Sequence, residues 1–233
     1  MQISKLPSLA IAFILLLGGV AVGAGLAHVL TSHQVQANAR QIQTVRQQMD
    51  IPFLQHMNLH HDQALTLSEI MQSKAISIPA SSMQLTVLSL AKNIEVSQRT
   101  EIGIFRGWLM LWEAEFIPRK VTMDWMVPNA TEDELAFISR CRSVGGGMEG
   151  MATMEELNQL SEAKPDVAVD LFLTLMQKHH EAALPMLEYA SRNAHTPQVK
   201  QLALTMWSEQ RKELLLIQKL RSLNLLNPNL INP

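Results

Sequence analysis

The sequence of 233 residues contains a single cysteine, Cys141, and only ten glycines and ten prolines. One cysteine excludes an internal disulfide and a zinc site built from several thiolates. So little glycine and proline excludes a collagen-like chain, and 47% hydrophobic residues exclude general disorder. The net charge of −2 lacks the basic field of nucleic-acid-binding proteins, so we expect no nucleic-acid partner.

Charge is absent from most of the N-terminal part of the chain. Lys5 is followed by no Lys, Arg, Asp or Glu until Arg40, and Leu9–Ala27 is a run of 19 apolar residues. As a helix, this run nearly spans a hydrocarbon core of about 30 Å. We expect residues 1–39 to be a single anchor helix in the inner membrane, with a cleaved export signal as the alternative. Either places the rest of the chain on the periplasmic side.

After Arg40 the apolar residues recur at helical spacing, and two blocks of the chain are similar. Residues 53–65 and 172–184 share the pattern F-L-x-x-M-x-x-H-H-acid-x-A-L, and residues 90–102 resemble residues 202–214. Both blocks recur in the same order, as expected of an internal repeat. We therefore predict an all-α fold in which two duplicated helical hairpins form a four-helix bundle, preceded by an N-terminal hydrophobic helix.

The repeats define the expected domain organisation. The predicted parts are a bundle domain at 40–223, with repeat one at 49–116, a connector at 117–165 and repeat two at 166–222, and a tail at 224–233. We expect long helices at about 35–71, 82–116, 166–194 and 197–220. In the connector, Thr131 and Glu134 have the spacing of a capping box and predict a short helix.

Each repeat places a methionine three and four residues before a pair of histidines. On a helix this spacing puts both imidazoles near the thioether. Thioether and imidazole together suit copper better than most other metals. The candidate metal ligands of the two repeats are Met57, His60, His61, Met176, His179 and His180.

Simpler explanations exist for the same residues. A methionine on an amphipathic helix is usually a core filler, and a buried histidine is often a hydrogen-bonded internal strut. The connector methionines, Met148, Met151 and Met154, fit either a thioether patch or core packing. A di-iron oxidase needs Glu-x-x-His on two helices, and no Glu of this sequence has a His three residues later.

The repeated Met-x-x-His-His-acid-x-Ala blocks, the Leu-Ala-x-x-hydrophobic-x-x-x-Gln-x-x-Glu blocks and the segment Gly147–Ala152 resemble the family called domain of unknown function 305. The resemblance covers about Met49 to Leu220. It implies a ferritin-like, exported helical protein and, for some members, copper binding. It also implies Met148 and Met151 as additional metal ligands. Pro185 departs from the family pattern, and we expect it to kink the second histidine helix.

These observations predict an exported metal-binding protein that binds, buffers or delivers copper in the periplasm and is not an enzyme. Its expected partners are a metal ion and, through the N-terminal helix, the membrane. One alternative is a structural or protein-interaction module whose histidine pairs are internal packing. A third is a metal oxidase.

Overall fold

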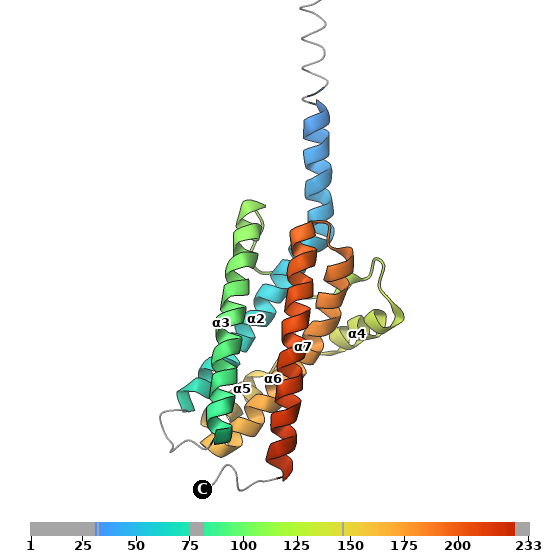
Figure 1. Cartoon of the computed structure of the whole chain (residues 1–233). Helices are drawn as coiled ribbons and strands as arrows, with labels where there is room; N and C mark the ends of the chain where they lie inside the picture. Colours follow the sequence, from blue (N-terminus) through green and yellow to red (C-terminus); the bar gives the residue numbers. More distant parts are fainter. Residues whose placement is uncertain (1–30, 32, 75–81, 146, 227–233) are drawn as a thin grey trace, which may run out of the picture. The chain divides into compact units, whose positions relative to one another are not determined.

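The computed structural model describes residues 31, 33–74, 82–145 and 147–226. Contacts divide the chain into two units, residues 1–44 and 45–233. In the first unit, residues 33–44 form a largely exposed helix (Figure 1). The apolar run Leu9–Ala27, with its expected helix, lies outside the described residues. Within the described ranges, none of the helices has both the length and the apolar character needed to cross a bilayer.

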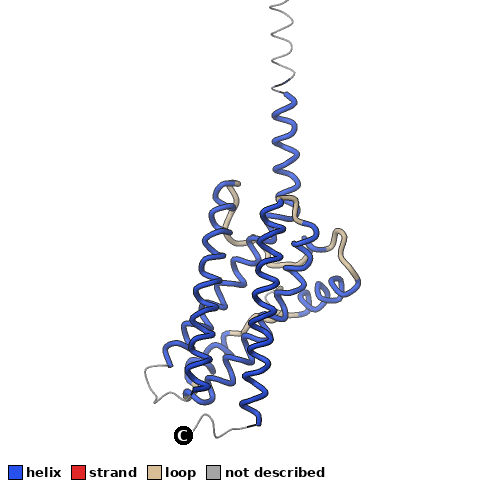
Figure 2. The backbone as a smooth tube through the Cα atoms, viewed as in Figure 1, coloured by secondary structure: helices blue, strands red, loops and turns tan. Residues whose placement is uncertain are grey.

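The second unit is built from helices and loops, and its described part contains no strand (Figure 2). The elements are the π-helix η1 (Arg46–Asp50), α2 (Ile51–Ser73), α3 (Ser82–Leu111), the 3-10 turn η3 (Asp124–Met126), α4 (Glu132–Ser143), α5 (Met154–Glu162), α6 (Pro165–Asn193) and α7 (Pro197–Leu226). The prediction of an all-α fold is confirmed. In Figure 1, α2 packs against α3 and α6 against α7, and α2 also contacts α6.

Local signals in the sequence set the ends of several helices. Thr131 accepts a hydrogen bond from the Glu134 N–H while the Glu134 carboxylate accepts one from Thr131, so the predicted capping box before α4 is present. Thr153 and Glu156 form the same box before α5. α3 ends at Leu111, five residues earlier than expected, because Glu113 takes the left-handed conformation, with φ 54°, that ends a helix.

The start of α7 depends on a residue far away in the sequence. We expect Thr196 to cap this helix, with Pro197 in its first turn. The buried carboxylate of Asp50 accepts hydrogen bonds from the N–H groups of His195 and Thr196, at 2.7 and 2.8 Å. A carboxylate at a helix N-terminus satisfies free N–H groups and favours the helix dipole. Asp50 therefore joins the beginning of α2 to the turn between α6 and α7.

The core consists of two apolar clusters. One contains Phe53, Met57 and Phe105, and the other contains Phe172 and Met176, each with further apolar side chains. Along each long helix, residues of one cluster come first and residues of the other follow. Polar residues occupy the positions between them, and these polar positions hold the candidate site.

Candidate metal site

A buried polar layer lies between the two apolar clusters and takes two residues from each long helix. This histidine layer consists of His60, His61, Gln98, Glu101, His179, His180, Gln210 and Glu213, all buried except Glu213, which is partly exposed. All four histidines are completely buried. The structure therefore brings together the four histidines that the repeat pattern predicts as metal ligands.

One histidine of each pair forms a short hydrogen bond with a glutamate of the neighbouring helix. His61 Nε2 lies 2.7 Å from Glu101 Oε2, and His180 Nε2 lies 2.6 Å from Glu213 Oε2. A carboxylate accepts, so Nε2 donates in both pairs, and Nδ1 of each ring has no hydrogen-bond partner. The two repeats thus build the same pair at equivalent positions. A histidine that binds a metal ion with one ring nitrogen commonly donates the N–H of the other to a carboxylate.

The other histidine of each pair lies at the contact between the two repeats. The rings of His60 and His179 lie against each other, with their centroids 3.6 Å apart and their planes tilted by 34°. His179 Nε2 lies 3.0 Å from the His60 carbonyl oxygen, which makes it the donor. Neither ring nitrogen of His60 has a partner, and His179 Nδ1 has none.

Burial makes the imidazoles of His60 and His179 poor bases. It lowers the pKa of His60 and of His179 well below 6.5, and the charges that neighbouring histidines would carry lower both further. Both rings are therefore neutral at pH 7. A neutral imidazole keeps one nitrogen lone pair, which is the form that binds metals.

A third carboxyl group approaches the layer from the surface. Glu209 of α7 is exposed and lies near Glu101 of α3. Partial burial and the charges of Glu101 and Glu213 raise the pKa of Glu209. The repeat pattern missed Glu209 because its equivalent in the first repeat is Ser97.

The methionine candidates do not gather as the histidines do. Met57 belongs to one apolar cluster and Met176 to the other, so they lie on different sides of the histidine layer. Met148 is buried in the first cluster and Met151 packs against it. Met154, the third of this spacing, is exposed at the start of α5. The three connector methionines share no helix, so their regular spacing gives them no common face.

Three polar residues near the histidines have other partners. His56 uses Nδ1 at the Pro52 carbonyl oxygen and accepts from the Thr122 N–H with Nε2, so both nitrogens are occupied. Asp62 pairs with Arg106. Glu181 accepts from Gln177 at 2.7 Å. None of the three therefore supplies a free ligand or orients a layer histidine.

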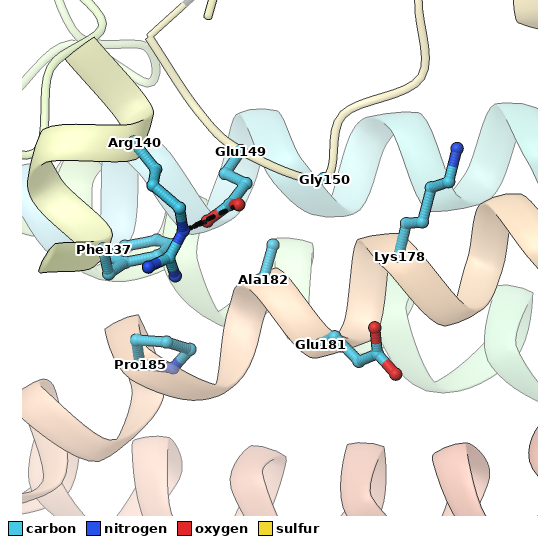
Figure 3. Close-up of a pocket in the computed structure, with 8 residues that line it drawn as sticks. All are labelled: Phe137, Arg140, Glu149, Gly150, Lys178, Glu181, Ala182 and Pro185. Carbon is cyan, nitrogen blue, oxygen red and sulfur yellow. Dashed lines mark hydrogen bonds and ion pairs between the residues drawn. The ribbon is translucent and has the colours of Figure 1, made fainter. Parts of the chain in front are cut away.

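Pro185, which we expect to kink the second histidine helix, lies inside α6, and the helix continues through it. α6 is helical from Pro165 to Asn193, and His180 keeps a pairing equivalent to that of His61. Proline removes the hydrogen bond to the carbonyl four residues earlier, here that of Glu181. Glu181 and Pro185 line the same open surface pocket of about 350 Å³ (Figure 3), where water can solvate the carbonyl group.

The imidazole nitrogens of the layer are donor atoms that suit copper, but these atoms do not converge on one point. Five ring nitrogens of the four buried histidines lack a hydrogen-bond partner. In the described ranges, no three His, Cys, Asp or Glu side chains are arranged to hold a metal ion. A site with three such ligands at this layer would therefore require side-chain rotation, whereas two imidazoles alone fall outside this criterion.

Comparisons with known proteins agree on one family. A family model described as Domain of unknown function (DUF305) matches residues 50–221. A DUF305 protein from Streptomyces coelicolor, described as secreted, is 27% identical with a TM-score of 0.58, over 72% of this chain and 89% of its own. A DUF305 fragment from Deinococcus radiodurans is 27% identical with a TM-score of 0.53, over 72% and 92%. No curated protein matches. Since the family model covers most of the chain, the protein belongs to the DUF305 family.

Proposed function

We propose that this protein is an exported copper-binding protein that buffers or delivers copper in the periplasm and catalyses no reaction. The four long helices act as one ferritin-like bundle, and the ion is held in the histidine layer. Export is supported by the apolar N-terminal run and by the similarity to a protein described as secreted. An N-terminal helix in the inner membrane would keep the bundle on the periplasmic side.

The observation that carries the proposal is the concentration of unpartnered ring nitrogens in one buried layer. Five nitrogens of four histidines have no hydrogen-bond partner. Each buried polar atom left unpaired costs about 1–3 kcal/mol. Native proteins keep few such atoms, and a cluster of them is typical of a place where an ion or water binds. A neutral imidazole carries one lone pair and one N–H, so at most four of these five nitrogens offer a lone pair, and copper would supply the positive charge that engages them.

The chain's own groups prepare the layer for a soft cation. His60 and His179 are neutral, so no proton has to leave them before they bind a metal. Glu101 and Glu213 each hold the Nε2–H of a histidine, which fixes the ring and leaves Nδ1 for the ion. Two imidazoles are the smallest ligand set that the layer offers. Such a set suits Cu(I), with Met57 and Met176 as the nearest thioether candidates in sequence.

Copper titration of the full chain, with competing Cu(I) and Cu(II) chelators, tests the proposal. We expect the double variant His60→Ala/His179→Ala to lower copper affinity at least about tenfold. The matched control, His33→Ala/His195→Ala, removes two exposed histidines and should bind copper like the parent. Circular dichroism would confirm that both variants remain helical. An unchanged copper stoichiometry in the first variant, or an equal loss in the control, would contradict the proposal.

One contact favours a second candidate, a structural role for the histidines. The hydrogen bond from His179 to the His60 carbonyl joins α6 to α2, and thus one repeat to the other. In this case the His60→Ala/His179→Ala variant should melt at a lower temperature in metal-free buffer. The parent protein should then show no stabilisation by added copper, whereas a ligand of the folded state must raise its melting temperature.

A further inference from the structure

The end of α3 and the turn after it expose more apolar surface than any comparable described stretch. Met110, Leu111, Phe116 and Ile117 are 67%, 74%, 40% and 57% exposed, all within eight residues. Elsewhere in the described ranges, no eight consecutive residues expose more than two large apolar side chains. Residues 110–117 are called the α3 tip. Clustered apolar exposure of this kind indicates a binding surface.

The α3 tip is a fixed turn. The Ala114 N–H donates to the Leu109 carbonyl at 2.8 Å, and Glu113 takes the left-handed conformation with φ 54° that ends a helix. The Gln55 amide of α2 donates to the Glu115 carbonyl at 2.8 Å. Trp112 turns inward and is buried, so the turn holds its outer apolar side chains in place against the core.

The tip lies at the end of the second unit where the chain enters it. The Arg46 guanidinium of η1 lies 4.8 Å from the centroid of the Trp112 ring, and Gln55 belongs to the first turns of α2. The sequence before this point includes the uncharged apolar run Leu9–Ala27. The 17 residues at 28–44 would reach about 25 Å as a helix. A tether this short keeps the tip at high effective concentration near any bilayer that holds the apolar run.

Cationic side chains adjoin the tip. Arg119 and Lys120 are exposed and line a pocket of about 500 Å³ together with Gln55, Trp125 and one carboxylate, that of Glu115, so its two cations outnumber its one anion. Apolar side chains beside a basic pocket match a phospholipid, which offers an acyl region next to an anionic phosphate. The charged side chains of Glu113 and Glu115 should keep the tip from inserting deeper than the lipid headgroups.

We propose that the α3 tip docks on the surface of a phospholipid bilayer, with its apolar side chains among the headgroups and lipid phosphates at Arg119 and Lys120. This contact is independent of copper binding. It would hold the end of the bundle that carries the tip against the membrane.

Spin labelling of the full chain in vesicles of phosphatidylethanolamine and phosphatidylglycerol tests the proposal. A nitroxide is attached at Leu111→Cys or, as the matched control, at Leu85→Cys, each in a chain that also carries Cys141→Ser. Leu85 is 57% exposed and lies near the opposite end of the same helix. Collision rates are measured with oxygen, which concentrates in lipid, and with a nickel complex that stays in water.

We expect the ratio of oxygen to nickel collisions at position 111 to be about threefold or more above that at position 85. Adding Ile117→Asp should bring the two ratios together, because a carboxylate opposes insertion. Equal ratios in the parent chain would overturn the proposal. A label at position 111 that is shielded from both reagents would also overturn it, because this pattern indicates contact with protein.

Discussion

The two helical pairs hold the connector in different ways, although they share one sequence pattern. At equivalent positions the first repeat has Gln63 and the second has Ala182. The Gln63 amide donates to the Ala152 carbonyl at 2.9 Å and accepts from the Ala152 N–H at 2.6 Å. Ala182 lies against Gly150, where an added Cβ would come within 2.4 Å of the Ala182 Cβ (Figure 3).

This difference separates two kinds of residue in the repeats. Positions that kept their identity, such as His61 and His180 with their glutamates, build the histidine layer from both halves. The diverged position contacts the connector instead. In the first repeat Gln63 does so by hydrogen bonds, and in the second Ala182 does so by its close approach to Gly150. Changes on the two sides should therefore differ in size and in mechanism.

The largest expected loss of stability comes from adding a side chain at Gly150, where the connector packs closely against the second repeat. Gly150→Ala would place a Cβ 2.4 Å from the Ala182 Cβ and 2.6 Å from the Lys178 carbonyl oxygen. The residue also has φ +80°, which favours glycine. Overpacking and the backbone conformation together should cost about 2–4 kcal/mol of unfolding free energy. Urea denaturation measures this loss of unfolding free energy.

A second substitution serves as the control for this prediction. Ala182→Gly removes one of the two close contacts, so the variant with both changes should recover part of the loss. If Gly150→Ala unfolds at the parent's urea midpoint, the close approach does not restrain the connector.

An intermediate effect is expected where the two repeats are alike. Burial lowers the pKa of His60 and His179 below 6.5, so the unfolded chain takes up protons more readily as the pH falls. Metal-free stability should be complete above pH 6.5 and decrease below it, by up to about 1.4 kcal/mol per pH unit for each histidine.

Thermal or urea unfolding in the presence of a chelator, between pH 7 and pH 5.5, measures this slope. His60→Leu and His179→Leu should each flatten it, by similar amounts, and the double variant should flatten it most. An equally steep slope in the double variant would place the titrating groups elsewhere.

The smallest effect is expected on the first repeat. Gln63→Ala, which copies the residue of the second repeat, removes two hydrogen bonds to the Ala152 backbone. Ala152 is only partly buried, so water replaces part of the loss, and we expect about 1–2 kcal/mol. Denaturation midpoints of this variant and of Gly150→Ala can be compared directly. A larger loss from Gln63→Ala than from Gly150→Ala would reverse the ranking of the two sides.

The sequence predicted what the repeats share. The recurring pattern located both histidine pairs, and the expected bounds of α6 and the expected start of α7 agree with the structure to within one residue, whereas α7 ends at Leu226, six residues later than expected. The box formed by Thr153 and Glu156 is equally legible, so α5 was also open to prediction. Each of these signals is local, because a helix and its caps depend on neighbouring residues.

The features that depend on distant contacts were not predictable. Glu209 joins the layer although its equivalent is Ser97, so no repeat marks it. The sequence also did not say which histidine of each pair faces inward, and in fact both are buried. In the first pair, His61 forms a hydrogen bond with a glutamate, whereas His60 lies against His179 of the other repeat. The positions of α3, α6 and α7 set this outcome.

X-ray absorption spectroscopy of the copper-loaded full chain tests the central claim most directly, because it identifies the atoms bound to the ion. Binding in the histidine layer predicts at least two imidazole nitrogens at about 2 Å, a signal that is lost in the His60→Ala/His179→Ala variant. A spectrum with sulfur ligands only, or an imidazole signal that survives in this variant, would contradict the assignment of the copper site to the histidine layer.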